Sequence, residues 1–337
     1  MRRARRRPAA TTLVVVALAG LVSLGISCGA SHPIWIDTDP AAGLPERDVD
    51  DALALAQAFA ASHLTVRGVS AVFGNAPLSD TGRIAADLVR LLGPAGVHVF
   101  PGASSAGMLG VETEASRALA EHLREESLTI LVLGPATNVA TVVMRHPALT
   151  SRIREIVAVA GRRPGQRFTT GTTNPAAHRD LNFELDPEAF RVLLDAEVPL
   201  TLTPFEISSQ VWLTGADLDR LATGGLAAQW LAGPARAWLQ VWRDVFAVDG
   251  FNPFDTLAVA AVATPQFVTC EMLPAAIVLG PDDGTEARMQ GTTPVEKPYL
   301  TVAPDVGSER RVRYCFEVAP EFKDHLIGAV RGLAPGR

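Results

Sequence analysis

Cysteine is scarce in this sequence, since the 337 residues contain only three. Cys28 falls in an apolar N-terminal segment, and Cys270 and Cys315 have no Cys or His neighbours at the spacing of zinc ligands, which argues against a zinc site. These two remain a candidate disulfide pair for an oxidising compartment. Past residue 30 there is no G-x-S-x-G motif either, so serine hydrolase chemistry is excluded.

The N-terminal segment lacks acidic residues altogether. Residues 1–27 contain five arginines and then an uncharged apolar stretch from Thr11 to Ile26, which is too short for a comfortable membrane span and indicates a secretion signal. Without those five arginines the formal charge falls from −6 to −11. An acidic protein of this kind is a poor partner for nucleic-acid polymers and anionic membrane surfaces.

The end of this segment, Leu24 to Cys28, resembles a bacterial lipoprotein signal in which the cysteine is lipidated. Gly25 departs from that pattern, because a bulky aliphatic residue is expected three positions before the cysteine. A lipid anchor on Cys28, a plain cleaved signal peptide and an uncleaved anchor therefore stay open. In each case we expect an exported protein, periplasmic or at the cell surface.

Internal repeats, low-complexity tracts and clear linkers are absent, so we expect residues 28–337 to form a single domain. Short apolar runs alternate with helical stretches such as 79–92, and the region 216–245 reads as helices. Residues 280–310 are rich in proline, glycine and charge, which favours loops and short strands. The pattern predicts an α/β fold with an open, mostly parallel central β-sheet flanked by helices. Its expected strands lie at 34–36, 64–73, 97–100, 128–133, 156–160 and 200–203.

Four carboxylates stand between the first strand and the helix that follows it: Asp37, Asp39, Asp50 and Asp51. The carboxyl ends of strands form the ligand-binding edge of an open α/β sheet. Clustered anions repel one another unless a cation neutralises them, and oxygen-only ligands favour Ca²⁺ or Mg²⁺. The alternative is that Asp48, Asp50 and Asp51 merely cap the helix N-terminus, which explains one or two acids but not all of them.

The motif Asp37-Thr38-Asp39-Pro40, with Asp50-Asp51 and an apolar helix after it, resembles the N-terminal motif of the calcium-dependent nucleoside hydrolases. The resemblance covers most of residues 33–330. Its further landmarks, in the family's order, are Gly74-Asn75, Phe100 to Ala103, Leu133 to Asn138, Asn174 to Asn182 and Asn252 to Val259.

This resemblance implies hydrolysis of the N-glycosidic bond of ribonucleosides, releasing base and ribose for purine or pyrimidine salvage. It implies that Asp39 acts as general base on a Ca²⁺-bound water, and that the protein forms a homo-oligomer. The implied metal ligands are Asp39, Asp51, the Leu133 carbonyl and Asp255. The implied ribose-binding residues are Asp50, Asn75, Asn174, Asp180, Asn182 and Asp255.

Three features depart from the family pattern. The loop between Pro40 and Asp50 is longer than usual, and Asp180 stands where glutamate is usual, so its contact with a ribose hydroxyl needs a closer sugar or a bridging water. Phe254 replaces a histidine that in several members is thought to protonate the departing base. A phenyl ring can pack on the base but has no proton to give.

Trp238 and Trp242 lie four residues apart, hence on one face of a predicted helix, where the resemblance places base-contacting aromatics. A stacking platform and ordinary core packing both fit this spacing. The seven histidines read mostly as surface or loop residues.

Two rival functions need weighing. Haloacid dehalogenase phosphatases also begin with a strand and D-x-D, but they carry Thr or Val where this chain has Ala41, and Pro40 follows Asp39 directly. That reading also leaves Asp180 and Asn182 unexplained. The second rival is an exported protein that binds a nucleoside or sugar without turnover. Asp180 and Phe254 favour it, whereas the intact Asp39 favours an enzyme.

Overall fold

The computed structural model describes residues 31–171, 177–283, 289–290 and 293–334. The predicted signal (1–27), the predicted lipid site Cys28 and the predicted ribose ligand Asn174 lie outside these residues. Ser31–Arg337 cluster as one compact unit. In the part of the chain that the structure describes, no helix combines the length and apolarity that crossing a membrane requires.

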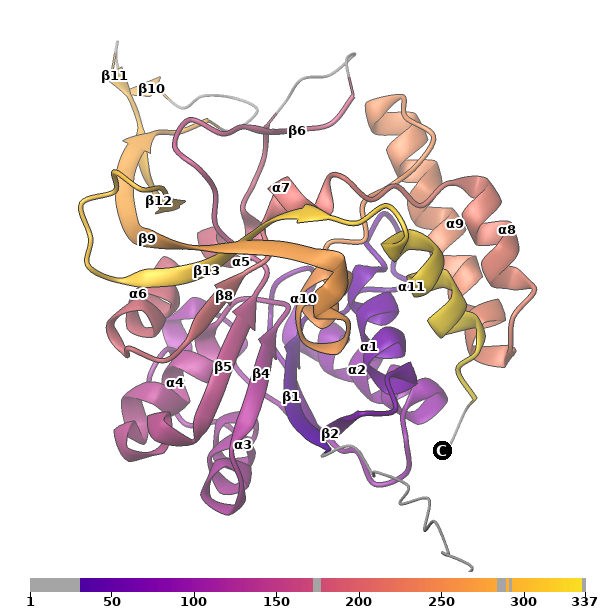
Figure 1. The fold of residues 1–337 in the computed structure, drawn as a ribbon, viewed down its shortest axis with the longest axis horizontal. Coiled ribbons are helices and arrows are strands. Elements are labelled where there is room, and N and C mark those ends of the chain that lie inside the picture. The colour runs from indigo at the N-terminus through magenta and orange to yellow at the C-terminus, as the bar shows by residue number, and fades with distance from the viewer. Residues whose placement is uncertain (1–30, 172–176, 284–288, 291–292, 335–337) are drawn as a thin grey trace, which may run out of the picture. The chain divides into compact units, whose positions relative to one another are not determined.

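A nine-stranded sheet forms the centre of this unit, in the order β12-β9-β13-β8-β5-β4-β1-β2-β3 (Figure 1). The strands from β3 to β13 pair in parallel. The predicted mostly parallel sheet and the six expected strands are confirmed. Their bounds are β1 His32–Thr38, β2 Leu64–Ala71, β3 Val99–Pro101, β4 Leu128–Val132, β5 Ile153–Ala158 and β8 Leu200–Leu202.

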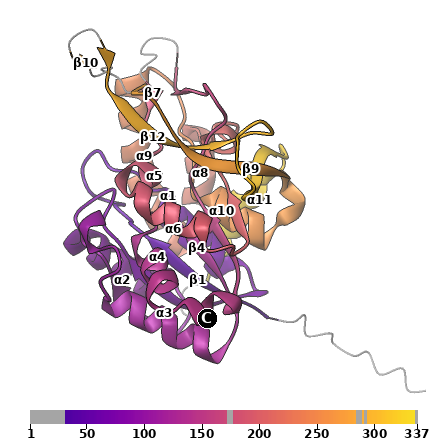
Figure 2. The ribbon, with the colours of Figure 1, turned by 90° about the vertical axis from the view of Figure 1, so that its left-hand side faces the viewer.

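The far edge of the sheet differs from the sequence prediction. The expected loops and short strands of 280–310 include β12, Glu296–Val302, which pairs antiparallel with the long strand β9, Val268–Pro281. Strand β13, Arg311–Val318, then joins β9 antiparallel and β8 in parallel. Figure 2 shows β9 and β12 at the opposite end of the domain from α2 and α3. Two short pairs complete the strands: β6 Phe168–Thr169 with β7 Ala177–His178, and β10 Met289–Gln290 with β11 Thr293–Pro294.

The candidate disulfide pair is bonded. Cys270 on β9 and Cys315 on β13 face each other in the antiparallel ladder and are bonded. The bond therefore joins the two strands that attach the C-terminal hairpin to the parallel sheet.

Helices cover both faces because side chains alternate along each strand. Ile34 and Ile36 on β1 pack into one apolar cluster with α1, α2 and the C-terminal helices, whereas Trp35 packs into a second cluster with α3, α4 and α6. The helices are α1 Asp50–Ala60, α2 Leu78–Leu92, α3 Glu114–Glu125, α4 Thr137–Arg145, α5 Leu181–Leu185, α6 Pro187–Asp195, α7 Phe205–Ser208, α8 Gly215–Ala222, α9 Leu226–Phe246, α10 Thr256–Ala263 and α11 Phe322–Arg331. The short 3₁₀ turns are η1 Ala106–Met108, η2 Pro147–Arg152 and η3 Pro265–Phe267.

The strand order reverses at β1, which lies between β2 and β4 although both follow it in the chain. Such a switch point opens a crevice at the carboxyl ends of the strands. The Asp37-Thr38-Asp39 motif stands at this end of β1. The topology therefore places the acidic cluster where an α/β sheet binds its ligands.

Candidate active site

The acidic cluster is assembled from the end of β1 and the first turn of α1. Asp39, Asp50 and Asp51 are all buried. The Thr38 hydroxyl and the Asp39 backbone N–H both donate to Asp51 Oδ1, the latter at 3.1 Å. The N-cap residue of α1 is Val49, which has no side-chain cap, and Asp50 Oδ1 accepts the Asp51 backbone N–H in the first turn at 3.2 Å.

Asp39 is fixed through one carboxylate oxygen. The Asn75 backbone N–H donates to its Oδ2 at 2.8 Å, and its Oδ1 is buried with no hydrogen-bond partner in the described part of the chain. An unpaired buried carboxylate oxygen is costly unless a cation or a ligand satisfies it. Asp39 therefore presents one oxygen to whatever occupies the site.

Gly74 is needed for this arrangement. A Cβ atom at Gly74 would lie 1.8 Å from Asp39 Oδ2. We expect Gly74→Ala to displace the Asp39 carboxylate and to lower kcat by at least about tenfold, because catalytic groups tolerate little misplacement. Steady-state kinetics would check this against Gly233→Ala, whose Cβ meets nothing within 4 Å and which should retain wild-type kcat. Equal kcat in the two variants would contradict the prediction.

Burial and mutual repulsion shift the protonation of the cluster. Burial, followed by the charge of Asp51, raises the pKa of Asp39 well above its usual value. Burial raises the pKa of Asp50 to about 7, with a further contribution from Asp51, and that of Asp51 to about 6. Opposite charge lowers a carboxyl pKa, so a bound cation would reverse these shifts.

Asp48 joins the cluster, which sequence reasoning considered only as a helix cap. Carboxylate oxygens of Asp48, Asp50 and Asp51 lie within 4.8 Å of one another, and Asp48 Oδ1 is buried without a partner in the described residues. The inserted loop before α1 folds back to bring this extra acid to the site. The donors present, all carboxylate oxygens with unpaired atoms among them, fit a hard divalent cation.

The two remaining predicted metal ligands also lie at this edge of the sheet. Asp255 precedes α10, and its pKa is raised by burial and then by the charge of Asp50. The Leu133 carbonyl, just after β4, accepts a hydrogen bond from Asn182 Nδ2 at 2.8 Å. A carbonyl oxygen has two lone pairs, so this bond leaves one for a cation.

A cavity of about 350 Å³ opens over the cluster. One wall carries the predicted sugar-binding side chains, and the other carries the predicted base-contacting aromatics together with further aromatic rings. The structure thus brings together residues from nine separate segments of the chain, Val159 and Ala160 among them. The lining residues include Asp48, Asp50, Asn75, Leu133, Asp180, Asn182 and Asp255 on the polar wall and Phe168, His178, Phe205, Trp238, Trp242, Phe246 and Phe254 on the aromatic wall.

Trp238 and Trp242 both line the cavity, and both also pack into the core. Trp242 is almost fully buried and meets Trp238 and Trp212 edge to face. The two alternatives for this pair, a platform for stacking and ordinary core packing, therefore both apply, to different faces of the same rings. The indole N–H groups of Trp238 and Trp242 are buried and have no hydrogen-bond partner among the described residues.

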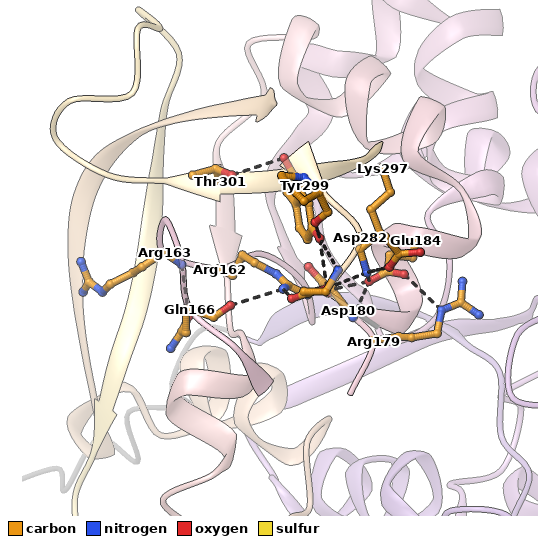
Figure 3. A network of polar contacts seen from close by, with 12 residues as sticks. Arg162, Arg163, Gln166, Arg179, Asp180, Glu184, Asp282, Lys297, Tyr299 and Thr301 are labelled. Carbon is orange, nitrogen blue, oxygen red and sulfur yellow. Dashed lines mark hydrogen bonds and ion pairs between the residues drawn. The ribbon is translucent and has the colours of Figure 1, made fainter. Parts of the chain in front are cut away.

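Asp180 is held from behind by a polar network (Figure 3). Its Oδ2 accepts from the Gly161 backbone N–H at 2.8 Å, and its own N–H donates to Glu184. Glu184 in turn pairs with Lys297 at 2.9 Å and with Arg179 at 3.1 Å. Burial raises the pKa of Asp180 to about 6, although the Arg162 charge opposes that shift. The shorter acid is therefore fixed to the protein through one oxygen, which leaves the other for a sugar hydroxyl.

His178, Phe205 and Phe246 are wall residues that sequence reasoning did not identify. His178 had been grouped with ordinary surface histidines, yet it lies between the rings of Phe205 and Phe246, with centroids 5.9 and 4.9 Å away. The sequence did offer one indication that His178 belongs to the site, because the residue lies within the motif from Asn174 to Asn182. Phe246 could have been found from its spacing, because it lies four residues after Trp242 on the same face of α9. Phe205 carried no local signal, because only the fold brings α7 to the site.

Two characterised groups of proteins are similar in sequence to this chain. Uridine nucleosidase 1 of Arabidopsis thaliana is 29% identical over 230 residues, 60% of this chain and 65% of that protein. The pyrimidine-specific ribonucleoside hydrolase RihA of Klebsiella pneumoniae is 26% identical over 266 residues, 70% of this chain and 81% of the relative. The chain thus spans just under two thirds of the Arabidopsis protein and a larger share of the bacterial one.

Solved structures agree in fold. A plant nucleoside hydrolase superposes with a TM-score of 0.69 at 20% identity, covering 89% of this chain and 98% of that one. A purine-preferring ribonucleoside hydrolase from Gardnerella vaginalis gives 0.69 at 19% identity with the same coverage. The sequence pattern of the inosine-uridine preferring nucleoside hydrolases matches residues 34–320, which include every site residue named above. The chain therefore belongs to the inosine-uridine preferring nucleoside hydrolase family, whose members are nucleoside N-ribohydrolases.

Proposed function

We propose that this protein is a Ca²⁺-dependent ribonucleoside hydrolase that releases free base and ribose. The observation that carries the proposal is Asp39, a buried carboxylate with one unpaired oxygen, hydrogen-bonded to Asn75, which lines a cavity that has a polar wall and an aromatic wall. These two walls match the two halves of a nucleoside. The names of the Arabidopsis and Klebsiella relatives add uridine and pyrimidine ribonucleosides as the first substrates to test.

Ca²⁺ is the proposed ion because the donors are all oxygen atoms, and some of them come from loop residues such as Asp48. Asp39, Asp51, Asp255 and the Leu133 carbonyl would hold it, with Asp48 close by. When bound, Ca²⁺ acidifies and orients a water and grips sugar hydroxyls.

The chain's own residues then perform the reaction. Asp39 takes the proton of the attacking water through its unpaired oxygen. Asp50, Asn75, Asp180 and Asn182 orient the ribose, and their negative or dipolar groups stabilise the positive charge that develops at the anomeric carbon. Such contacts strengthen in the transition state, which is what accelerates the reaction.

Turnover assays on the purified protein test this proposal directly. The protein with Ca²⁺ would be incubated with uridine, cytidine, inosine, adenosine and nicotinamide riboside, and free base and ribose would be measured. Cleavage that a chelator abolishes and Ca²⁺ restores is the expected result. Calcium and riboside binding without any free base would instead establish the binding protein that does not turn its ligand over.

Metal removal should also change how stability depends on pH. The raised pKa values mean that the folded, metal-free protein binds more protons than the unfolded chain between the ordinary aspartate value of 3.8 and about 7. Its free energy of unfolding should therefore fall as pH rises through that window. We expect a lower Tm at about pH 7.5 than at about pH 5.5 in a chelator, and the largest gain from Ca²⁺ at the higher pH.

Thermal unfolding at both pH values, with and without Ca²⁺, measures this. Asp50→Asn is the matched control, because it removes one titrating group and should flatten the pH dependence of the metal-free Tm. If the Tm of the wild type in chelator rises with pH instead, the prediction that the raised aspartate pKa values control this stability is contradicted.

We also propose that the protein is exported, since residues 1–27 have the composition of a secretion signal, and that Cys28 carries the anchor if one is present. Labelling with a radioactive fatty acid in a bacterial host, compared with Cys28→Ala, tests this. Label in the wild type alone supports lipidation, whereas a processed but unlabelled protein supports a cleaved signal.

The family resemblance also leads us to expect a homo-oligomer. Light scattering on the purified protein would measure its oligomeric state.

A further inference from the structure

The aromatic wall of the cavity contains one polar ring. His178 on β7 stacks on Phe205 at 5.9 Å and on Trp242 at 6.3 Å, and it meets Phe246 edge to face at 4.9 Å. All four residues line the cavity. The side of the cavity that fits a nucleobase therefore places an imidazole among rings that could stack on the base.

The orientation of this imidazole is set by Thr170. His178 Nε2 lies 2.9 Å from Thr170 Oγ1, and Thr170 is buried. The other ring nitrogen, Nδ1, makes no hydrogen bond to any of the described residues and is the nitrogen available to a ligand. Thr170 thus leaves a single imidazole nitrogen free on the aromatic wall.

The reaction needs a polar group at this place. When the bond from C1′ to the base breaks, its electron pair stays on the base, and a hydrogen-bond donor stabilises the resulting charge. Phe254 and the other phenyl rings of the wall have no donor, whereas the indole N–H groups of Trp238 and Trp242 are buried without a hydrogen-bond partner among the described residues and are rival donors. Arg179 also borders the cavity but is paired with Glu184. Among these donors, His178 is the one whose ring is fixed by a hydrogen bond to a buried side chain, that of Thr170.

We propose that His178 donates a hydrogen bond from Nδ1 to the departing base, with the Thr170 hydroxyl donating to Nε2 to fix that tautomer. This inference rests on the proposed function. The bond from C1′ to the base breaks, water adds its oxygen to C1′, Asp39 takes the water's proton, and the base leaves as an anion that solvent then protonates. His178 stays neutral throughout.

Burial supports this role because it lowers the pKa of His178, so the imidazole is neutral at neutral pH. A neutral imidazole can act as an electrophile by hydrogen bonding, without transferring its proton. This mode suits bases whose anions are stabilised on a carbonyl oxygen, as in uracil, better than bases that must be protonated on a ring nitrogen before they leave, as in adenine. The geometry therefore favours uridine over adenosine.

The test compares two leaving groups on one sugar. Uridine has a poor leaving group, whereas p-nitrophenyl β-D-ribofuranoside releases a phenolate that needs no help. We expect His178→Phe, which keeps an aromatic ring in the cluster, to lose about 100-fold in kcat/KM for uridine and less than about threefold for the aryl riboside. Thr170→Val should show the same selectivity for uridine with a smaller loss, and His178→Gln, which retains an N–H group, should recover part of the His178→Phe loss.

The possible outcomes are distinct. Equal losses on both substrates, or no loss on either, would overturn the role of His178, since the first indicates a packing role and the second no role. If the wild type with Ca²⁺ cleaves neither substrate, the proposed function itself fails, and this inference fails with it. Wild-type cleavage of both substrates shows that the proposed function holds, whatever the variants do.

Discussion

Asp39→Asn should fold, bind Ca²⁺ and ribosides, and lose at least about 100-fold in kcat, equivalent to about 3 kcal/mol of transition-state stabilisation. The amide keeps the size of the carboxylate and can still accept the Asn75 N–H at the Oδ2 position. It cannot take a proton from water. The loss should therefore appear in kcat far more than in riboside affinity.

Single-turnover kinetics and calorimetric riboside binding would separate these effects. Asp37→Asn is a matched control, because Asp37 is also buried on β1 but accepts hydrogen bonds from Ser70 and Asn138. Asp37 Oδ2 is also unpaired among the described residues, but unlike Asp39, Asp37 makes no hydrogen bond to Asn75, which lines the cavity. That variant should lower Tm while leaving kcat near wild type. Turnover in Asp39→Asn comparable to that of the wild type would remove Asp39 as the base.

Removing the disulfide should have the largest effect on stability. Cys270 and Cys315 close a loop with a sequence separation of 45 residues, so the bond restricts the unfolded chain by an entropy worth about 4 kcal/mol. Alanine at both positions leaves no free thiol and preserves the antiparallel ladder between β9 and β13. We expect the double variant to lose about 3–4 kcal/mol in its free energy of unfolding and to keep its kcat.

Urea denaturation with activity assays would measure both quantities. Wild-type protein unfolded in the presence of a reductant should approach the double variant in stability, while the double variant should be insensitive to reductant. A wild-type midpoint that reductant does not change would show that the bond contributes little. The site residues lie outside this strand pair, so we expect the disulfide to affect stability and not catalysis. A large fall in kcat would contradict that expectation.

Much of the fold followed from local pattern. Apolar runs such as Leu128 to Leu133 predicted their strands correctly, because a strand buried on both faces has one continuous hydrophobic signature. Strand β9 had no such signature, since its side chains are mostly half-buried or exposed and it contains Pro274 and Gly280. It pairs with β12, which follows it in a hairpin, and with β13, which lies further along the chain. Only long-range pairing makes this segment a strand.

The site residues also divide into those that local sequence pattern predicts and those that depend on long-range packing. Asp39, Asp50 and Asp51 were identifiable because their spacing and the flanking apolar runs fix them at one strand end. Asp48 was not, because its approach depends on how the inserted loop folds back. His178 was missed because its surroundings come from α7 and α9, which follow it in sequence. Residues whose roles depend on packing between distant elements had no local signal.

The position of β13 has a consequence for how the chain reaches its native state. This strand, Arg311–Val318, lies between β8 and β9, so the sheet cannot be completed until almost the whole polypeptide has been synthesised. Contacts between segments that are distant in the sequence make folding slow, and they delay the cooperative completion of the sheet. A nascent chain lacking its last few dozen residues would therefore remain open, with the edge of β8 unpaired.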